Sequence, residues 1–553
     1  MLTTRAALLL LLAATLGQQT WYVSRAVLPA QDAVDFVSVA QRIEREGFLA
    51  TVRAEPVPPL FPASICVVHR TLMRCGIIES RQWGRAAQWA AACALVAAVV
   101  PAFLFARRLV DPLAACCGTL VFFSLPEVAR LGADGTSDAL HLFFAATALW
   151  SLAAMPDVVE SRLWRWSLLC GACLGAALLV RSEMLVVAAV MLVVGLAAFV
   201  VSRPAGFRRR GLVAACGLGI FTAVAPYLAS GISDPLDLAR RLRGGGAPTE
   251  ETPLNAAVAE PMMGAAVQSP AEPRLGKKDP TRSIRFHGFL ATVAEFAKEL
   301  AQASAYLFVP AACYGAWALR RRQGNWRPAD RLAATFIAGL AVAIFAVAWR
   351  GGYLSSRHLL LPLLVMMPYA GIAAARLTES TVAALGDLSH AGGDWEPATR
   401  GYVTVVAAVM VAQFLTYSDP EPAHESQSAH RDAARWLDSY AAAPGHVLDQ
   451  QGFTALSSGR VTYRFEAAEQ ALADERLAYV LLERADLDAQ SPRGGQLRKL
   501  LGDAAESVAQ FSDPRGKSER DVLVFSRLRP ESPKSSINVP LTTVQQNRTS
   551  HAR

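Results

Sequence analysis

The chain has 553 residues, of which 53% are hydrophobic and only 18% are charged. Soluble domains are about one-quarter charged, and here the charges lie between long uncharged runs, so an array of soluble domains is excluded. The same composition excludes collagenous, disordered and disulfide-scaffold proteins. We therefore expect most of the chain to lie in lipid.

A formal net charge of +8 would by itself fit a protein that binds nucleic acid. However, the chain has 48 Arg and only 6 Lys, and no basic run on a polar segment is interleaved with aromatic residues. A membrane protein that keeps its cations in cytoplasmic loops explains this balance better. We expect membrane lipid as a partner and no nucleic acid.

Eleven apolar runs are predicted to span the membrane, because a spanning helix needs about 20 mostly apolar residues. They are 6–24, 86–106, 112–126, 139–156, 166–180, 184–202, 211–233, 300–319, 332–349, 359–375 and 401–418. The two shortest, 112–126 and 166–180, would need extension or shielding by neighbouring helices. The first run could also be a signal peptide, since Arg5 precedes its apolar core, but we favour an uncleaved first helix.

Arginines follow every second predicted helix and set the orientation. They are Arg107, Arg108, Arg162, Arg165, Arg203, Arg208, Arg209, Arg210, Arg320, Arg321, Arg322, Arg327, Arg331 and Arg376. All of them are cytoplasmic if the N-terminus is inside, and an odd number of helices then places the C-terminus outside. We predict a polytopic α-helical protein of the plasma (inner) membrane with about 11 transmembrane helices.

Polar segments divide the chain into three predicted parts. Residues 1–418 form a transmembrane module with outer loops at 25–85 and 234–299. Residues 419–528 form a small extracytoplasmic α/β domain, and residues 529–553, rich in Pro, Ser, Thr, Gln and Asn, form a disordered tail. In the α/β domain, the pattern predicts a helix and three strands, at His430–Tyr440, Val461–Phe465, Leu477–Leu482 and Val522–Phe525.

Charged residues near the membrane are costly, so they usually mark a site or an internal pair. Asp32 follows the first helix closely, at the outer interface, where a carboxylate could act as a general base for an acceptor hydroxyl or amine. Alternatively, Asp32 or Asp35 could simply begin the loop helix. The segment 56–62 has four Pro residues and reads as a rigid, non-helical stretch on the membrane surface.

A second acidic group stands where the fourth helix begins, with Asp134 and Asp138 followed by His141. Helix capping would explain one of these acids but not two acids and a histidine. Arg181 and Glu183 interrupt two apolar runs on the same outer side. They could form an internal ion pair, or a break there could let Arg181 face a cavity.

The segment before the tenth helix contains Tyr353, Arg357 and His358 after two glycines. The Arg357 guanidinium has a planar set of donors that suits a phosphate, although an interfacial anchor is the alternative. All these polar groups lie on one side of the membrane. We therefore expect Asp32, Asp138, Arg181 and Arg357 to converge on one cavity at the outer leaflet.

In order and in spacing, these segments resemble the membrane-embedded GT-C glycosyltransferases, which include protein O-mannosyltransferases and lipid A aminoarabinose transferases. Asp32, Phe36 and Ala40 match an acidic first-loop motif whose second acid is replaced by Ala33. The stretch 58–62 is similar to a His-Pro-Leu-Tyr-Pro segment, with Pro58 in place of His.

Three later segments extend the resemblance. Ser137-Asp138-Ala139-Leu140 is similar to a Ser/Thr-Asp-Ala stretch at the start of a helix. Residues 171–183 are similar to a Gly-rich helix that ends in Leu-x-Arg-Pro-Glu, with Ser182 in place of Pro. Residues 356–362 are similar to an Arg-Tyr-Leu-x-Pro element.

The resemblance implies a sugar donor carried on a polyprenyl phosphate and an acceptor that could be a glycan, a lipid or a protein. Asp32 would deprotonate the acceptor, and Arg357 and Arg181 would bind the leaving phosphate. Asp138 would orient the acceptor or hold the Arg and His groups. No cofactor is certain, although a divalent metal is possible. The competing classes are a transporter or flippase of lipid-linked glycans and a non-enzymatic envelope scaffold.

Overall fold

The computed structural model describes six main stretches of the chain, 4–155, 160–181, 206–232, 289–388, 427–488 and 507–526. Within them lie short gaps at 56, 325–327 and 352–353 and several between 440 and 467. Val190 and His424 are described as well. The predicted spans 184–202 and 401–418, most of the loop 234–299 and the tail 529–553 lie outside the described residues, apart from a few positions. The full helix count therefore stays a prediction.

The described part of the chain is mostly helical. The bundle helices are α1 (Thr4–Arg25), α5 (Trp83–Leu109), α6 (Pro112–Phe123), α9 (Asp138–Ala154), α10 (Glu160–Val180), α12 (Gly206–Ala229), α14 (Phe289–Ala303), α15 (Phe308–Gln323), α16 (Pro328–Gly351) and α17 (Leu360–Leu388). Four helical segments are long and apolar enough to cross a membrane, namely 4–25, 83–109, 162–180 and 356–378. Shorter apolar segments lie at 112–123, 138–154, 217–229 and 333–349. The chain is thus a multi-pass membrane protein.

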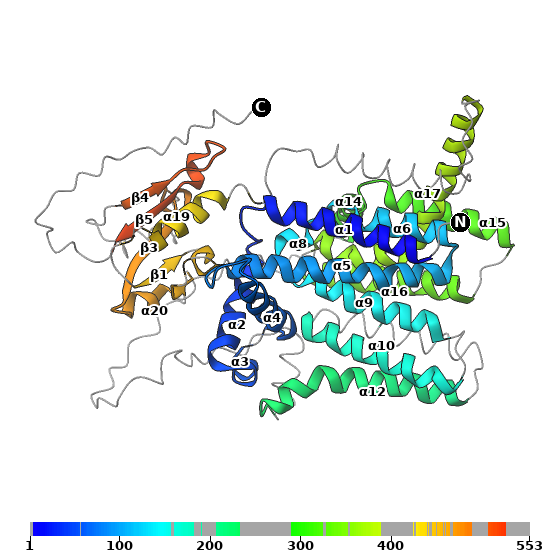
Figure 1. Ribbon diagram of the computed structural model, residues 1–553, viewed down its shortest axis with the longest axis horizontal. Helices are drawn as coiled ribbons and strands as arrows, with labels where there is room; N and C mark the ends of the chain where they lie inside the picture. Colours follow the sequence, from blue (N-terminus) through cyan, green and yellow to red (C-terminus); the bar gives the residue numbers. More distant parts are fainter. Residues whose placement is uncertain are drawn as a thin grey trace, which may run out of the picture.

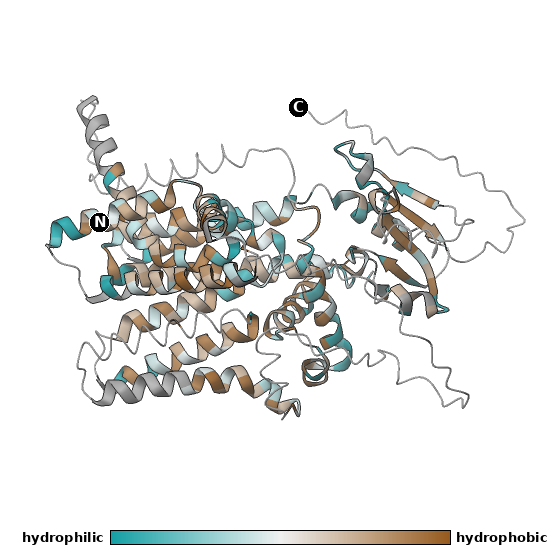
Figure 2. Cartoon of the chain, turned by 180° about the vertical axis from the view of Figure 1, so that it is seen from behind, coloured by the Kyte–Doolittle hydropathy of each residue, from teal (hydrophilic) through white to brown (hydrophobic). Residues whose placement is uncertain are grey.

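Figure 1 shows most of the bundle helices running roughly parallel to one another, with the N-terminus at one end of the bundle. The helices α2, α3 and α4 and the β-sheet lie at the opposite end. In Figure 2, apolar colours dominate the bundle helices, and hydrophilic segments gather toward the two ends. This distribution matches a bundle that is embedded in lipid between two aqueous faces.

Two predicted spans differ from the observed helices. The predicted run 300–319 is wrong as one helix, because α14 ends at Ala303 and α15 starts at Phe308, with Ala305 and Tyr306 in the left-handed region between them. The run 112–126 is one helix only as far as Phe123, where α6 ends after 12 residues. Two one-turn helices follow it, α7 (Pro126–Ala129) and α8 (Leu131–Asp134).

Close helix packing places α17 against both α6 and α15. A Cβ atom at Gly371 in α17 would overlap the backbone oxygen of Ala114, and one at Gly118 in α6 would overlap that of Met367. At Gly315 in α15, a Cβ atom would overlap the backbone oxygen of Tyr369. Glycine thus lets these backbones touch, which holds short α6 inside the bundle.

The segment between α1 and α5 folds into α2 (Asp32–Glu46), α3 (Phe48–Ala54) and α4 (Leu60–Arg74). The expected apolar face of α2 is present, with Val34, Val37 and Ala40 buried. The expectation of a non-helical surface segment over 56–62 is wrong at its end, because Leu60, Phe61 and Pro62 form the first turn of α4. Proline is tolerated there, since the first N–H groups of a helix have no partner within it.

The C-terminal residues form a five-stranded sheet in the order β2-β1-β3-β5-β4. Its strands are β1 (His446–Asp449), β2 (Thr462–Tyr463), β3 (Leu477–Glu483), β4 (Ser507–Phe511) and β5 (Val522–Ser526). β1 is parallel to β2 and β3, whereas β5 is antiparallel to β3 and β4. Strands β3 and β5 lie where they were predicted, whereas β1 and β4 were not expected.

Helices cover both faces of the sheet. The helix α19 (Ser428–Ser439), close to its predicted position, packs Leu437 against Val447 and Leu481 on one face. On the other face, α20 (Ala468–Ala473) packs beside Leu448. A further short helix, α21 (Arg484–Asp488), follows β3 directly.

Specific contacts join the C-terminal unit to one end of the bundle. Arg81, just before α5, pairs with Asp438 in α19. Gln41 Nε2 in α2 donates to the backbone oxygen of Ala455 at 3.0 Å. These contacts hold the C-terminal unit against α2 and the start of α5.

Candidate active site

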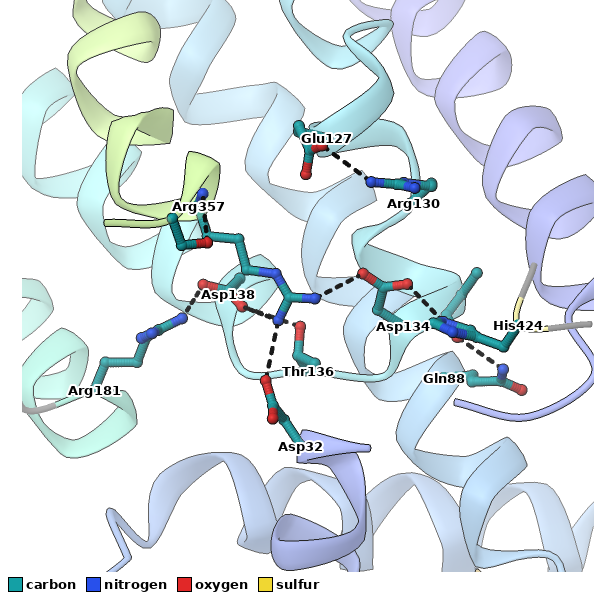
Figure 3. Close-up of polar contacts among 12 residues, drawn as sticks. Asp32, Gln88, Glu127, Arg130, Asp134, Thr136, Asp138, Arg181, Arg357 and His424 are labelled. Atoms are coloured by element: carbon teal, nitrogen blue, oxygen red, sulfur yellow. Dashed lines mark hydrogen bonds and ion pairs between the residues drawn. The ribbon is translucent and has the colours of Figure 1, made fainter. Parts of the chain in front are cut away.

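The centre of the candidate site is the guanidinium of Arg357, which contacts three carboxylates (Figure 3). Its Nη1 lies 3.4 Å from Asp32 Oδ2 and 3.6 Å from Asp138 Oδ2. Its Nη2 donates to Asp134 Oδ2 at 3.2 Å. These residues belong to four segments: the 3₁₀ turn 356–359, the start of α2, the end of α8 and the start of α9.

Hydrogen bonds from neighbouring segments hold the turn that carries Asp134 and Asp138. Gly135 ends α8 with a φ of 65°, a conformation in which glycine is favoured. The backbone oxygen of Asp134 accepts from the N–H of Ala30 at 2.9 Å, and Gln88 Nε2 in α5 donates to the backbone oxygen of Ala133 at 2.8 Å. The first loop and α5 therefore set the position of both acids.

Asp138 is the most enclosed of the three acids. Its side chain is only 4% exposed, and it pairs with Arg181 as well as with Arg357. Thr136 Oγ1 donates to Asp138 Oδ2 at 3.1 Å. The helix-capping alternative is not what the structure shows, because Ser137 is the N-cap of α9 and makes no side-chain capping bond. A buried carboxylate with two cations holds those cations in place.

Asp134 has a partner that the sequence did not reveal. His424 Nε2 lies 3.0 Å from Asp134 Oδ1, so the carboxylate bridges His424 and Arg357. His424 lies between the bundle and α19, 290 positions from Asp134. No residue pattern around His424 distinguishes it from an ordinary loop histidine.

Exposure separates the acids. The side chain of Asp32 is 73% exposed, against 9% for Asp134 and 4% for Asp138. Asp32 stands in the first turn of α2 without capping it, since Gln31 is the N-cap and makes no side-chain capping bond. Asp32 is therefore the carboxylate that a bound molecule can reach.

The structure brings together the four residues expected to converge, Asp32, Asp138, Arg181 and Arg357. Their catalytic and binding roles stay predictions. His141, one turn into α9, lies close enough to act electrostatically on Asp138.

Other predicted supporting residues lie elsewhere. Asp35 Oδ1 pairs with Arg464 Nη1 at 2.5 Å and so faces the C-terminal unit. His358 Nδ1 accepts from the backbone N–H of Ser355 at 3.1 Å, which stabilises the turn that carries Arg357. Glu183 and Tyr353 lie outside the described residues.

The carboxylates of this site face cations of the protein itself. Within the part of the chain that the structure describes, no group of three or more His, Cys, Asp or Glu side chains could hold a metal ion. Asp134 and Asp138 instead pair with Arg357 and Arg181, and Asp134 also contacts His424. The described residues thus favour an arginine-based site for an anion.

Comparison with known proteins gives both a sequence match and a fold. A family model described as dolichyl-phosphate-mannose-protein mannosyltransferase matches residues 76–229. No curated protein matches the chain. The matched residues include α5 to α10, and with them Asp134 and Asp138.

Solved structures share the fold across nearly the whole chain. ArnT from Cupriavidus metallidurans in the apo state is similar, with 13% identity, a TM-score of 0.59 and coverage of 94% of this chain and 97% of that chain. The same protein bound to undecaprenyl phosphate gives 14% identity, a TM-score of 0.58 and coverage of 94% and 98%.

A third similar structure is archaeal. AglB, the oligosaccharyltransferase from Archaeoglobus fulgidus in complex with an inhibitory peptide and a dolichol-phosphate, gives 11% identity, a TM-score of 0.51 and coverage of 88% of this chain and 70% of that chain. ArnT and AglB are both GT-C glycosyltransferases. In its fold this chain is therefore similar to ArnT and AglB, and its residues 76–229 match the mannosyltransferase family model.

Proposed function

We propose that the protein transfers a sugar from a polyprenyl-phosphate-linked donor to an acceptor at the outer face of the plasma (inner) membrane, with inversion at the anomeric carbon. The observation that carries the proposal is that one exposed carboxylate, Asp32, shares the Arg357 guanidinium with two buried ones, Asp134 and Asp138. This arrangement puts a base beside a phosphate-binding cation.

Arg357 is suited to the leaving phosphate. Its guanidinium carries five fixed N–H donors, and a phosphate accepts two of them in parallel. Asp134 and Asp138 hold the arginine from the buried side, whereas the side chain of Asp32 is largely exposed. A donor phosphate can replace Asp32 as a partner of Arg357 without disturbing the two buried contacts.

The replaced Asp32 carboxylate is then available as the base. It takes the proton from the acceptor hydroxyl or amine, whose oxygen or nitrogen attacks the anomeric carbon from the face opposite the phosphate. The bond between the anomeric carbon and the phosphate oxygen breaks, and the electron pair stays on the lipid phosphate. Arg357, with Arg181 held beside it by Asp138, stabilises the charge that develops there.

The structures of similar proteins support the donor class. The ArnT structure that shares this fold holds undecaprenyl phosphate, and the AglB structure holds a dolichol-phosphate and a peptide. Both lipids are polyprenyl-type phosphates, the chemistry that the arginine pair suits. The C-terminal unit, on the same end of the bundle as α2 in Figure 1, would face outward with the site.

The test is whether reconstituted protein cleaves the bond between the sugar and the phosphate of the donor lipid. Proteoliposomes with a labelled polyprenyl-phosphate sugar and a crude envelope acceptor fraction should release one free polyprenyl phosphate for each sugar transferred. The anomeric configuration of the product, read by NMR, should be opposite to that of the donor. Movement of intact donor lipid across the bilayer without bond cleavage would instead establish a flippase.

A further inference from the structure

The C-terminal sheet has a topological switch point that faces the candidate site. The three parallel strands lie in the order β2-β1-β3, so the chain leaves β1 toward one side of the sheet and leaves β3 toward the other. Loops that diverge in this way leave a crevice at the carboxyl ends of the two strands, where α/β sheets bind ligands.

Polar side chains meet at these carboxyl ends. Glu483 is the last residue of β3, and Gln451 follows β1 by two residues. Gln451 Nε2 donates to Glu483 Oε1 at 3.3 Å, which bridges the gap between the strands. His430, at the start of α19, places Nε2 3.0 Å from the same Glu483 oxygen.

This polar group is connected directly to the first outer loop. Gln31 Nε2 donates to Gln451 Oε1 at 2.6 Å, and Gln31 immediately precedes Asp32. The crevice and the proposed base are therefore adjacent. A molecule whose reactive group reaches Asp32 would extend naturally over Gln31, Gln451 and Glu483.

One atom of the group lacks a partner. The His430 side chain is 4% exposed, and its Nδ1 is buried with no hydrogen-bond partner among the described residues. The ring is thus fixed beside Glu483 through Nε2, while Nδ1 faces the interior.

We infer that the carboxyl ends of β1 and β3 form a subsite for a neutral, hydroxyl-rich acceptor, meaning a saccharide, with Glu483 and Gln451 as its binding residues. This inference rests on the proposed function, because it names the acceptor of that same reaction. A carboxylate and carboxamides accept and donate to sugar hydroxyls, whereas the negative charge of Glu483 disfavours an anionic acceptor.

The hydrogen bond from His430 lowers the pKa of the Glu483 carboxyl, so the group is ionised at neutral pH. The two amides supply both donors and acceptors, which hydroxyl groups require in equal measure.

The chain contains a matched control at the other end of the same strands. His446, at the start of β1, pairs with Asp474, which also accepts from the hydroxyl of Tyr463 at 2.9 Å. His446 and Asp474 thus form a second histidine–carboxylate pair, like that of His430 and Glu483. This second pair lies at the amino ends of the strands, away from the proposed crevice. Substitutions in the two pairs should disturb the sheet alike but affect the acceptor differently.

The experiment measures saccharide binding without any transfer. Full-length protein in lipid nanodiscs is applied to an array of neutral and of uronic-acid-containing oligosaccharides. Wild type and Asp474→Asn should bind a set of neutral oligosaccharides, and Glu483→Gln should bind the same set at least tenfold more weakly. If Glu483→Gln does not fold, Gln451→Ala, which changes a loop residue, serves as the second variant. A thermal unfolding curve for each variant checks that it is folded.

Two results would overturn the inference. One is equal binding by wild type, Glu483→Gln and Gln451→Ala. The other is that folded wild-type protein binds only the acidic oligosaccharides or binds none of the array. Asp32→Asn should leave the array binding unchanged, so loss of transfer and loss of acceptor binding are distinguishable, and a failure of this inference leaves the proposed transfer reaction standing.

Discussion

Arg357 and Asp32 are 325 positions apart in the chain, yet Arg357 Nη1 lies 3.4 Å from Asp32 Oδ2. On its other side, the guanidinium is held by Asp134 and Asp138, whose side chains are more than nine-tenths buried. Exposed ion pairs contribute little free energy, so the contact with Asp32 is the one that a bound phosphate replaces most easily. Arg357 can thus exchange its contact with Asp32 for a phosphate while it keeps its contacts with Asp134 and Asp138.

Substitution of Arg357 by Lys should lower the transfer rate by about two orders of magnitude, because an ammonium keeps the charge but loses the planar fork of donors. The rate of sugar transfer in proteoliposomes measures this effect. Arg42→Lys, which changes an α2 arginine paired with Glu46 and Glu55, is the matched control and should keep nearly full activity. Equal rates for wild type and Arg357→Lys would show that Arg357 does not bind the phosphate.

Substitution of His424 by Ala should lower the transfer rate by about tenfold, because Asp134 would lose one of its two partners while remaining buried. Gln at position 424 should restore most of the rate, since its amide can donate to the carboxylate. The comparison of kcat for His424→Ala with that for His446→Ala, a histidine at the far end of the sheet, checks the prediction. If both alanine variants fall equally, His424 acts only through the stability of the C-terminal unit.

Substitution of Gly371 by Ala should destabilise the bundle by about 1–3 kcal/mol, because the added methyl group meets the backbone of α6 at Ala114. Gly17→Ala is the control, since a Cβ atom there meets nothing within 4 Å and alanine favours a helix. Thermal unfolding in detergent compares the two. Gly371→Ala as stable as Gly17→Ala would contradict the close packing of α6 and α17.

The pH dependence of stability should carry a contribution from Glu483. The hydrogen bond from His430 lowers the pKa of Glu483, while burial acts in the opposite direction, and Gln451 and Arg520 add to the lowering. A carboxyl whose folded pKa is lowered stabilises the fold above its unfolded pKa of about 4.3 and loses that contribution as the pH falls through the folded pKa.

The unfolding midpoint of wild type should therefore drop more steeply below about pH 4.3 than that of Glu483→Gln. Thermal unfolding in steps between neutral pH and pH 3 measures the difference. Parallel curves for the two proteins would remove Glu483 from the acid response.

The sequence located much of the site because charges are scarce in an apolar chain. Asp138, Arg181 and Arg357 stand out at the outer ends of helices, and the structure brings them together. His424 and Gln451 could not be found in this way, since single polar residues in polar segments carry no signal. Their roles depend on how the C-terminal unit packs, which no local pattern encodes.

The helices were predictable where an apolar run is long, as in α1 and α5. They were less predictable where tertiary contacts decide where a helix begins or ends. Short α6 is stabilised by the contact between Gly118 and α17 rather than by length. No glycine or proline marks the break between α14 and α15, so the sequence did not signal it. Ala305 and Tyr306 take the left-handed conformation there instead. Strand β1 has only four residues, too few for a period to show.

The most direct test of the proposed mechanism compares Asp32→Asn with Asp35→Asn in the same reconstituted transfer assay. Both acids lie in the first turn of α2, but Asp32 contacts Arg357, whereas Asp35 contacts Arg464. Loss of a general base costs about 10²–10⁴-fold in rate, so Asp32→Asn should lose nearly all transfer while Asp35→Asn keeps most of it. Full transfer activity of folded Asp32→Asn would contradict Asp32 as the base.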